Sequence, residues 1–227
     1  MKNTDTGHPK KIKVLVVDDH PIVRQGLAQV INQEPDMVLD SEAADVAEAM
    51  DRYRKAKPDF AIIDISLKGG NGLELTKSLL ALDPKLPVLI MSMHDESLYV
   101  QRVLKAGARG YLMKQEATER VVNAIRKILA GDVYVSERMN EALLNQLASG
   151  ASGKASAKNA SVENLSDREL EILQLVGQGR GTRQIAEEIH VSVKTVESHY
   201  AKIKEKLNLK NANELIQYAV KWYHSEP

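Results

Sequence analysis

The sequence predicts an α/β fold with a doubly wound, five-stranded parallel sheet, followed by a second, smaller all-α domain. Across residues 11–132, short apolar runs alternate with amphipathic helical segments. Three of these runs are continuously apolar, as expected for parallel strands that are buried on both faces. From residue 165 to the end the pattern is helical throughout, which indicates the second domain.

The sheet and its helices can be placed along the chain. The expected strands are IKVLVV (12–17), MVLD (37–40), FAII (60–63), PVLIMS (87–92) and GYLM (110–113). The expected helices lie near residues 21–32, 45–56, 72–81, 97–106 and 118–130. Because βαβ crossovers are right-handed, five such units allow few topologies, and the first and third strands should be central neighbours. A polar tail, residues 1–10, precedes them.

Residues 133–164 should connect the two domains. A helix is predicted at 136–147, and the segment 147–164 then loses hydrophobicity and fills with Ala, Ser, Gly and Lys. This composition is typical of a flexible, exposed linker.

The domain at 165–227 shows helix boundaries. Ser166 and Glu169 match a capping box that opens a helix ending near Val176. Thr182 is expected to cap a short helix, His190-Val191 to form a turn, and Ser192 to cap a helix that ends at Leu207. A last helix is expected at 211–223. The predicted core of this domain consists of Ile185, Ala186, Ile189, Val191, Val193, Val196, Ile203 and Leu207.

Composition limits the possible functions. The chain has 227 residues, no cysteine, and 31 basic residues balanced by 31 acidic ones. Disulfides and thiolate metal sites are excluded, which fits a cytoplasmic location, and no apolar stretch suggests a membrane span or signal peptide. Nucleic-acid binding would need a local patch. Such a patch lies at Lys194, Lys202, Lys204, Lys206 and Lys210, although a solvated helix face explains it equally well.

Polar residues stand at the ends of four predicted strands. Asp18 and Asp19 end the first strand, Asp64 the third, and Ser92 the fourth, while Lys114 follows the fifth. Ligands bind at this edge of doubly wound sheets. Clustered carboxylates repel one another unless a cation holds them, and oxygen ligands suit Mg²⁺. An acceptor carboxylate, a metal, a lysine and a hydroxyl make a phosphoryl-transfer site.

Each of these residues also has an ordinary structural explanation. The aspartate pair, with Pro21 after it, could simply cap the next helix. Asp64 could begin a loop, Ser92 could be a satisfied hydroxyl, and Lys114 could lie on the surface. Four such coincidences at four strand ends favour the site.

The motifs VDDHPIVRQGL, IIDISLKGGNGLEL, MSMHDE and KAGARGYLMK resemble the receiver domain of two-component response regulators, and DDHP is typical of the NarL/FixJ branch. The resemblance implies that Asp64 is both the phosphoacceptor and a metal ligand, that Asp19 binds Mg²⁺ directly and that Asp18 binds it through water. It also implies that the backbone carbonyl of Ser66 completes the metal site, that Ser92 and Tyr111 form the switch pair, and that Lys114 binds phosphate.

One position departs from the receiver pattern. Lys68 stands where a proline is common, and Gly69 and Gly70 follow it. We expect a more mobile loop with an extra cation, and a Lys68 that alters phosphoryl lifetime or kinase docking. Ser66 and His94 resemble lifetime-tuning positions of the family.

The segment LSDRELEILQLVGQGRGTRQIAEEIHVSVKTVESHYAKIKEKL resembles the LuxR-type helix-turn-helix domain. In such domains the recognition helix lies in the major groove. The resemblance places Glu197, Ser198 and Ala201 at base-reading positions. The residues suited to phosphate contact or helix orientation are Lys194, Thr195, His199 and Lys202.

The expected function is therefore that of a response regulator. A sensor histidine kinase would phosphorylate Asp64, and the phosphorylated chain would bind double-stranded DNA as a homodimer, although no exposed apolar face stands out in the sequence. Two alternatives stay open. The receiver could serve as a dimerisation module in a phosphorylation-independent regulator, or the chain could be a phosphatase. The phosphatase usually needs a second acid two residues after its nucleophile, where this chain has Ser66. Self-directed transfer to Asp64 does not make the chain an enzyme.

Overall fold

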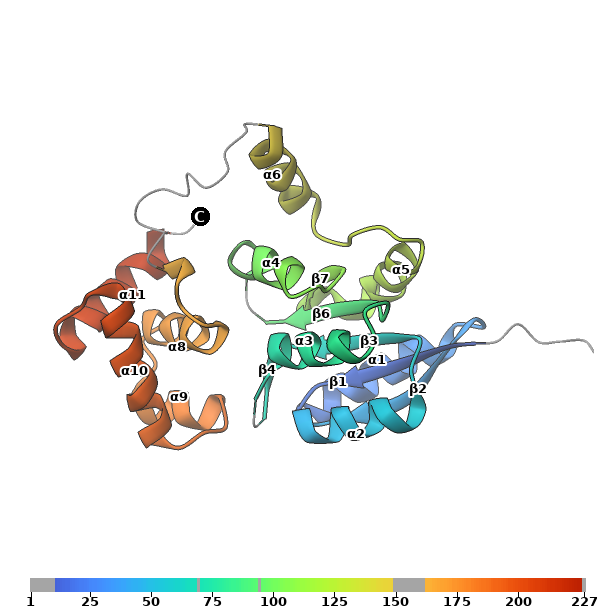
Figure 1. Cartoon of the computed structure of the whole chain (residues 1–227), viewed down its shortest axis with the longest axis horizontal. Helices are drawn as coiled ribbons and strands as arrows, with labels where there is room; N and C mark the ends of the chain where they lie inside the picture. Colours follow the sequence, from blue (N-terminus) through green and yellow to red (C-terminus); the bar gives the residue numbers. More distant parts are fainter. Residues whose placement is uncertain (1–10, 69, 94, 149–161, 226–227) are drawn as a thin grey trace, which may run out of the picture. The chain divides into compact units, whose positions relative to one another are not determined.

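The computed structural model describes residues 11–68, 70–93, 95–148 and 162–225, drawn in Figure 1. The chain forms two compact units, residues 1–140 and 141–227, which are described separately below. In the described ranges, every helix is too short or too polar to cross a membrane.

The first unit is built on a five-stranded sheet, which confirms the predicted doubly wound fold. The strand order is β2-β1-β3-β6-β7, and every neighbouring pair is parallel. The strands are β1 (Ile12–Val17), β2 (Met37–Ala43), β3 (Phe60–Asp64), β6 (Val88–Ser92) and β7 (Gly110–Met113). As expected, β1 and β3 are central neighbours, so their carboxyl ends lie side by side.

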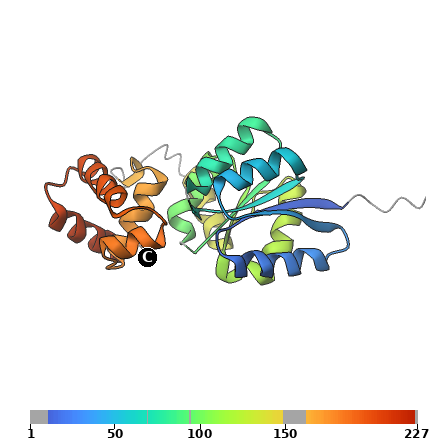
Figure 2. The same ribbon diagram turned by 90° about the horizontal axis from the view of Figure 1, so that it is seen from below.

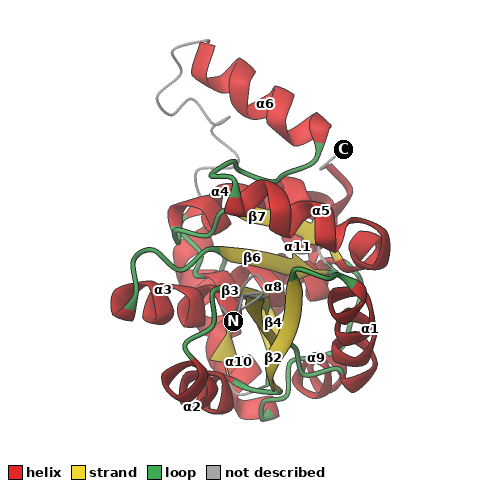
Figure 3. Cartoon of the chain, turned by 90° about the vertical axis from the view of Figure 1, so that its right-hand side faces the viewer, coloured by secondary structure: helices red, strands yellow, loops and turns green. Residues whose placement is uncertain are grey.

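Helices cover both faces of this sheet. Figures 2 and 3 show α1 (Pro21–Gln33) and α5 (Ala117–Leu129) on one face, with α2 (Val46–Ala56) and α3 (Gly72–Leu82) on the other. The α4 helix (Glu96–Lys105) packs beside β7, and a short 3₁₀ helix, η1 (Lys114–Glu116), leads into α5. Apolar side chains of α1 and α5 form one core cluster with the sheet.

A small hairpin after β3 was not predicted. The two-residue strands β4 (Ser66–Leu67) and β5 (Gly70–Asn71) pair antiparallel, where we expected a mobile loop. Gly70 lies against α2, because a Cβ atom there would come 2.6 Å from Cγ2 of Val46. Lys68 is exposed at the turn. Backbone pairing therefore holds the flanks of this loop beside the end of β3.

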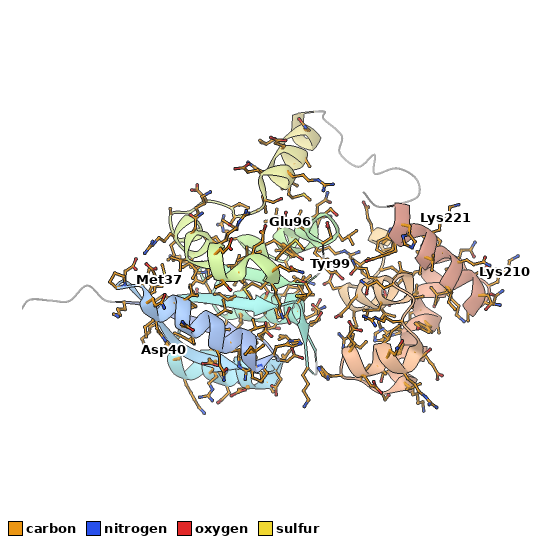
Figure 4. The ribbon with its side chains drawn as sticks, turned by 180° about the vertical axis from the view of Figure 1, so that it is seen from behind. Met37, Asp40, Glu96, Tyr99, Lys210 and Lys221 are labelled. Atoms are coloured by element: carbon orange, nitrogen blue, oxygen red, sulfur yellow. The ribbon has the colours of Figure 1, made fainter. Side chains whose placement is uncertain are left out.

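The segment after α5 extends the sheet by one residue. The N–H of Tyr134 donates to the carbonyl of Arg109 at 2.9 Å, and its carbonyl accepts from the N–H of Tyr111 at 2.8 Å. Next to it, Ser136 donates its N–H to Glu96, which Figure 4 shows at the start of α4. The helix α6 (Glu137–Ala148) follows, close to its predicted position. This segment therefore covers the free edge of β7.

The second unit contains the predicted helical domain. Its helices are α8 (Asp167–Gly177), α9 (Thr182–Glu188), α10 (Val193–Leu207) and α11 (Ala212–Ser225). The capping box of Ser166 and Glu169 is present, and His190, with φ 54°, forms the turn between α9 and α10. Most of the linker prediction falls on residues 149–161, outside the described ranges. Val162, which we placed in the linker, is buried.

Two local predictions in this unit were wrong. Thr182 does not cap α9, because the helix begins at Thr182 itself and Gly181 is the N-cap. Gly181 has no side chain to accept a hydrogen bond, but its N–H donates to Gln184 at 2.9 Å, which is half of a capping box. Val193 is 39% exposed rather than core. It is the first residue of α10, one turn before the apolar stripe that begins at Val196.

Candidate functional site

Three aspartates meet at the carboxyl edge of the sheet. Asp18 and Asp19 follow β1, and Asp64 ends β3, which pairs directly with β1. Together with His20, they bring one possible ligand atom each within 4.8 Å of one another. Asp18 and Asp64 are buried. The parallel pairing of β1 and β3 therefore explains why carboxylates 46 positions apart in sequence form one cluster.

Lys114 brings a positive charge into this cluster from the end of β7. Its Nζ atom lies 2.7 Å from Oδ2 of Asp18 and 2.7 Å from Oδ2 of Asp64. Burial opposes the charge on Lys114, but the two carboxylates outweigh burial and raise its pKa. Burial also raises the pKa of Asp64 to about 7. The positive charge of Lys114 opposes this rise, and the negative charge of Asp18 adds to it. The cluster thus favours an added positive charge.

The aspartate pair does not cap α1 with its side chains. The N-cap residue is His20, and no side chain caps the helix. Instead, Oδ1 of Asp18 accepts from the N–H of His20 at 2.9 Å, and Nδ1 of His20 lies 2.7 Å from Oδ1 of Asp19. The histidine ring itself is largely exposed. The helix-cap explanation for the pair therefore fails, and His20 joins the cluster, which we did not expect.

The donors present fit a magnesium ion. One ammonium group cannot neutralise three clustered carboxylates, and Mg²⁺ prefers a few carboxylate oxygens together with water and phosphate oxygens. Ser66, whose backbone carbonyl we expected as a ligand, begins β4 two residues after Asp64 and is half-buried.

The switch pair lies on neighbouring strands. Ser92 ends β6 and Tyr111 lies in β7, and each is 1% exposed. Burial raises the pKa of Tyr111, opposed by a side-chain hydrogen bond with Ser92. The ring of Tyr111 therefore lies inside the receiver.

In the second unit, α10 presents the predicted DNA-contacting residues. Its exposed members are Lys194, Glu197, Ser198, Ala201 and Lys202. Thr195 is half-buried. Its N–H donates to Oγ of Ser192 at 3.1 Å, and its own hydroxyl lies 2.8 Å from the same oxygen. It therefore helps to cap the helix.

Two other residues of α10, His199 and Lys206, are better suited to structural roles than to DNA contact. Burial and the charges of Lys202 and Arg168 lower the pKa of His199, whose Nδ1 atom finds no hydrogen-bond partner among the described residues. A neutral, half-buried histidine suits the orientation of α10 rather than pairing with phosphate. Lys206, which we counted in the basic patch, lies 2.7 Å from Glu169 of α8.

Sequence reasoning missed one arginine near the acid cluster. Arg24 donates to the carbonyl of Asp18 and to Glu42 of β2. Arg24 belongs to the motif VDDHPIVRQGL. Its position six residues after Asp18, in the expected first helix, was the sequence signal that could have suggested this contact.

The fold and the two surfaces together define a class. A doubly wound sheet that carries three aspartates and a lysine at one edge, followed by a separate unit with a helix-turn-helix, is the architecture of receiver-containing transcription regulators.

Comparisons with known proteins agree with this class. Residues 14–126 match the model of the response regulator receiver domain, and residues 163–219 match that of bacterial regulatory proteins of the luxR family. The chain is 38% identical over 211 residues to the oxygen regulatory protein NreC of Staphylococcus carnosus, covering 92% of this chain and 97% of that protein. An NreC of Staphylococcus aureus is 37% identical over the same share of both chains.

Solved structures of response regulators are also similar to this chain. The RcsB response regulator of Salmonella typhimurium, described in connection with DNA interaction, matches with a TM-score of 0.55 at 25% identity, over 93% of this chain and 99% of that one. A LuxR-family two-component response regulator from Aurantimonas matches with a TM-score of 0.56 at 34% identity, over 61% and 99%. The chain belongs to the two-component response regulators that join a receiver domain to a LuxR-type DNA-binding domain, the NarL family.

Proposed function

We propose that this response regulator takes a phosphoryl group onto Asp64 from a sensor histidine kinase, in a Mg²⁺-dependent reaction, and that phosphorylation controls its binding to DNA in the cytoplasm. The supporting observation is the position of Lys114. Its ammonium lies 2.7 Å from the carboxylates of both Asp64 and Asp18 at the open edge of the sheet. A buried acceptor carboxylate beside a fixed cation is what phosphoryl transfer needs.

The transfer follows from these positions. An oxygen of the Asp64 carboxylate attacks the phosphorus of a phosphohistidine in line, forming an acyl phosphate as the phosphorus–nitrogen bond breaks and its electron pair stays on the imidazole. Lys114 holds Asp64 at the strand end and balances charge on the transferred group. A bound Mg²⁺ would supply the further positive charge that keeps Asp64 ionised and shields the phosphate oxygens. Asp18, Asp19, Asp64 and the backbone carbonyl of Ser66 would hold it.

The same residues connect the acceptor to the segment that leaves the receiver. The hydroxyl of Ser92, one strand away from Asp64, can turn to the new phosphate. Tyr111 in the next strand donates its N–H to Tyr134, and Glu96 accepts from Ser136 at 2.8 Å just before α6. A shift of the loop between β6 and α4 would therefore act on the segment before α6 through the hydrogen bond from Ser136 to Glu96.

DNA recognition is assigned to the exposed face of α10. Glu197, Ser198 and Ala201 would reach base edges, and Lys194 and Lys202 would contact phosphates. Thr195 and His199 would orient the helix. Sequence preference is then expected to be modest, because Ala201 offers only apolar contact and Glu197 can read only a donor such as cytosine N4.

A homodimer on DNA is proposed through α11. Ile216 is 50% exposed and Tyr223 is 37% exposed, and half-buried Val220 lies between them. Their spacing places all three on one face of α11. We had found no such face in the sequence. A second copy of this chain would cover it and set two α10 helices on a two-fold DNA site.

The alternative is a phosphorylation-independent regulator, whose receiver, with Tyr111 buried in its core, would serve as a dimerisation module. Equal DNA binding by wild type and Asp64→Ala would favour this alternative.

The direct test of the phosphoacceptor is mass spectrometry of the intact protein after incubation with acetyl phosphate and Mg²⁺. Wild type should gain one phosphoryl group, and the gain should be lost in Asp64→Ala and on removal of Mg²⁺ with EDTA. Labelling of Asp64→Ala to the wild-type extent would contradict the assignment. Continuous release of phosphate from simple phosphate esters would instead indicate a phosphatase.

A further inference from the structure

The carbonyl of Asp18 lies where the sheet can no longer bind it. The N–H of Asp18 still donates to Ala43 of β2 at 3.1 Å, but the pairing of β1 with β3 ends one residue earlier, at Val17. Asp18 is 1% exposed, so its backbone is shielded from water. A buried carbonyl without a hydrogen-bond partner is destabilising, so this group needs a donor from elsewhere in the fold.

Arg24 supplies that donor from α1. Its Nη1 atom lies 2.5 Å from the carbonyl oxygen of Asp18, and its Nε atom donates to Oε2 of Glu42 at 3.2 Å. The Arg24 side chain is mostly buried, while that of Glu42 is partly exposed. The guanidinium group is planar and rigid, so two bonds in different directions fix its orientation. Arg24 thereby ties the end of β1 to β2.

With this bond, each polar group of Asp18 is engaged. Its N–H binds Ala43, its carbonyl binds Arg24, its Oδ1 accepts from His20 at 2.9 Å, and its Oδ2 lies 2.7 Å from Lys114. A metal-binding carboxylate performs best when neighbouring groups hold it in place before the ligand arrives. The carboxylate of Asp18 cannot keep this position if its own backbone is free to turn.

The charge of Arg24 matters as much as its hydrogen bond. A bare guanidinium next to the aspartate cluster would repel a divalent cation. Glu42 compensates that charge without joining the cluster, because its carboxylate accepts from Nε of Arg24 and is not among the clustered ligand groups of the described residues. The pair therefore supplies a donor while changing the local net charge little.

We propose that Arg24, held by Glu42, is a positioning residue that orders Asp18 for cation binding. This inference rests on the proposed Mg²⁺-dependent phosphorylation and adds a residue to that site. Arg24 touches neither the acceptor carboxylate of Asp64 nor the phosphoryl group. It acts through the backbone of Asp18.

The chain offers a matched control in the second unit. Arg168 donates to the carbonyl of Ile189 at 2.5 Å and to the carboxylate of Glu171 at 2.7 Å. This is the same chemistry, an arginine that satisfies a backbone carbonyl and pairs with a glutamate, in a domain without the aspartate cluster. Arg168→Ala should therefore lower stability without changing affinity for Mg²⁺.

The experiment is isothermal titration of the full chain with MgCl₂, paired with thermal unfolding in EDTA. For Arg24→Ala we expect the Kd for Mg²⁺ to rise about tenfold, because Asp18 loses its backbone anchor. Arg24→Lys should recover part of the loss, since one ammonium can replace one of the two bonds. Glu42→Gln should raise the Kd about threefold at low salt, and the effect should shrink as ionic strength rises.

The results separate this inference from the function on which it rests. If the wild-type chain binds no Mg²⁺ at millimolar concentration, the proposed function itself fails. If wild type binds and folded Arg24→Ala binds equally well, the positioning role is wrong. It is also wrong if Arg168→Ala weakens Mg²⁺ binding as much, because the effect would then be general. If Arg24→Ala does not fold, Glu42→Gln decides, and an unchanged Kd at low salt overturns the inference.

Discussion

In the receiver, polar groups from separate strand ends converge on one buried cluster, whereas α10 in the second unit presents its polar groups one by one to solvent. Asp18, Asp64 and Lys114 come from three strands and contact one another within the sheet edge. Lys194, Ser198 and Lys202 share one helix and stand apart on its surface. Removing Lys114 takes the shared cation from both carboxylates, whereas removing one of the α10 side chains leaves its neighbours unchanged. Mutations should therefore have large effects in the receiver and graded effects on α10.

The largest effect on stability is expected for Lys114→Ala. Two buried carboxylates would lose their shared cation, and the free energy of unfolding of the receiver should fall by about 3 kcal/mol in EDTA. Mg²⁺ should restore part of the loss by replacing the missing charge. Urea denaturation followed by far-UV circular dichroism measures both. Lys105→Ala, at an exposed lysine of α4, is the control and should change little. A Lys114→Ala protein as stable as wild type would contradict the claim that the receiver cluster depends on its shared cation.

A backbone substitution tests how tightly the cluster is built. A Cβ atom at Gly72 would overlap the carbonyl oxygen of Asp64, so Gly72→Ala must displace Asp64, the proposed phosphoacceptor. We expect a loss of about 2 kcal/mol and slower phosphorylation by acetyl phosphate. Gly26→Ala is the matched control, because Gly26 lies inside α1 and a Cβ atom there would meet nothing within 4 Å. It should stabilise the protein by about 0.5 kcal/mol and leave phosphorylation unchanged. Equal effects of the two substitutions would contradict the account.

The ion pair between buried Glu169 and exposed Lys206 gives a pH-dependent prediction for the second unit. Burial alone would raise the pKa of Glu169, but Lys206 and the N–H of Ser166 outweigh burial and hold this pKa below its ordinary value. The carboxylate therefore stabilises the folded state above the pKa of the unfolded chain, roughly 4.3, and loses this effect as pH falls through the folded pKa.

Glu169→Gln should accordingly cost about 1 kcal/mol at pH 7 and almost nothing in acid below both pKa values. Trp222 of α11 is the single tryptophan of the chain, so its fluorescence during urea titration reports on this unit. A difference between variant and wild type that grows toward acid pH would reverse the assigned sign.

The smallest effects are expected on the surface of α10. Lys194→Ala and Lys202→Ala should each weaken DNA binding on all sequences and reduce the slope of log K against log salt by about 0.9. Lys206→Ala should leave that slope unchanged, because Lys206 pairs with Glu169. Fluorescence anisotropy at several salt concentrations measures the slope. If Lys206 contributes as much as Lys194, the separation of structural from DNA-contacting lysines is wrong.

The same contrast explains what could be predicted from the sequence. The cluster of Asp18, Asp64 and Lys114 was predictable because continuous apolar runs reveal buried parallel strands, and the ends of such strands meet at one edge. The exposed residues of α10 were predictable from helical period alone. In both cases the hydrophobic periodicity of the sequence determines where the side chains lie, independently of how their neighbours pack.

Other features depend on contacts that no periodicity encodes. The pairing of β4 with β5 and of Tyr134 with β7 involves one or two residues each, too few to leave a pattern. The bond from Arg24 to Asp18 depends on where a long side chain lies after folding. Val193 fits the apolar pattern of α10, yet it stands on the first helical turn, before the helix reaches the core.

The most direct test of the central claim is DNA binding with and without phosphorylation. Wild type and Asp64→Ala would be applied to a panel of genomic DNA fragments, with and without acetyl phosphate and Mg²⁺. We predict that only wild type treated with both binds more tightly, and only to some fragments. Equal binding by both proteins under every condition would contradict the account and make the receiver an assembly module.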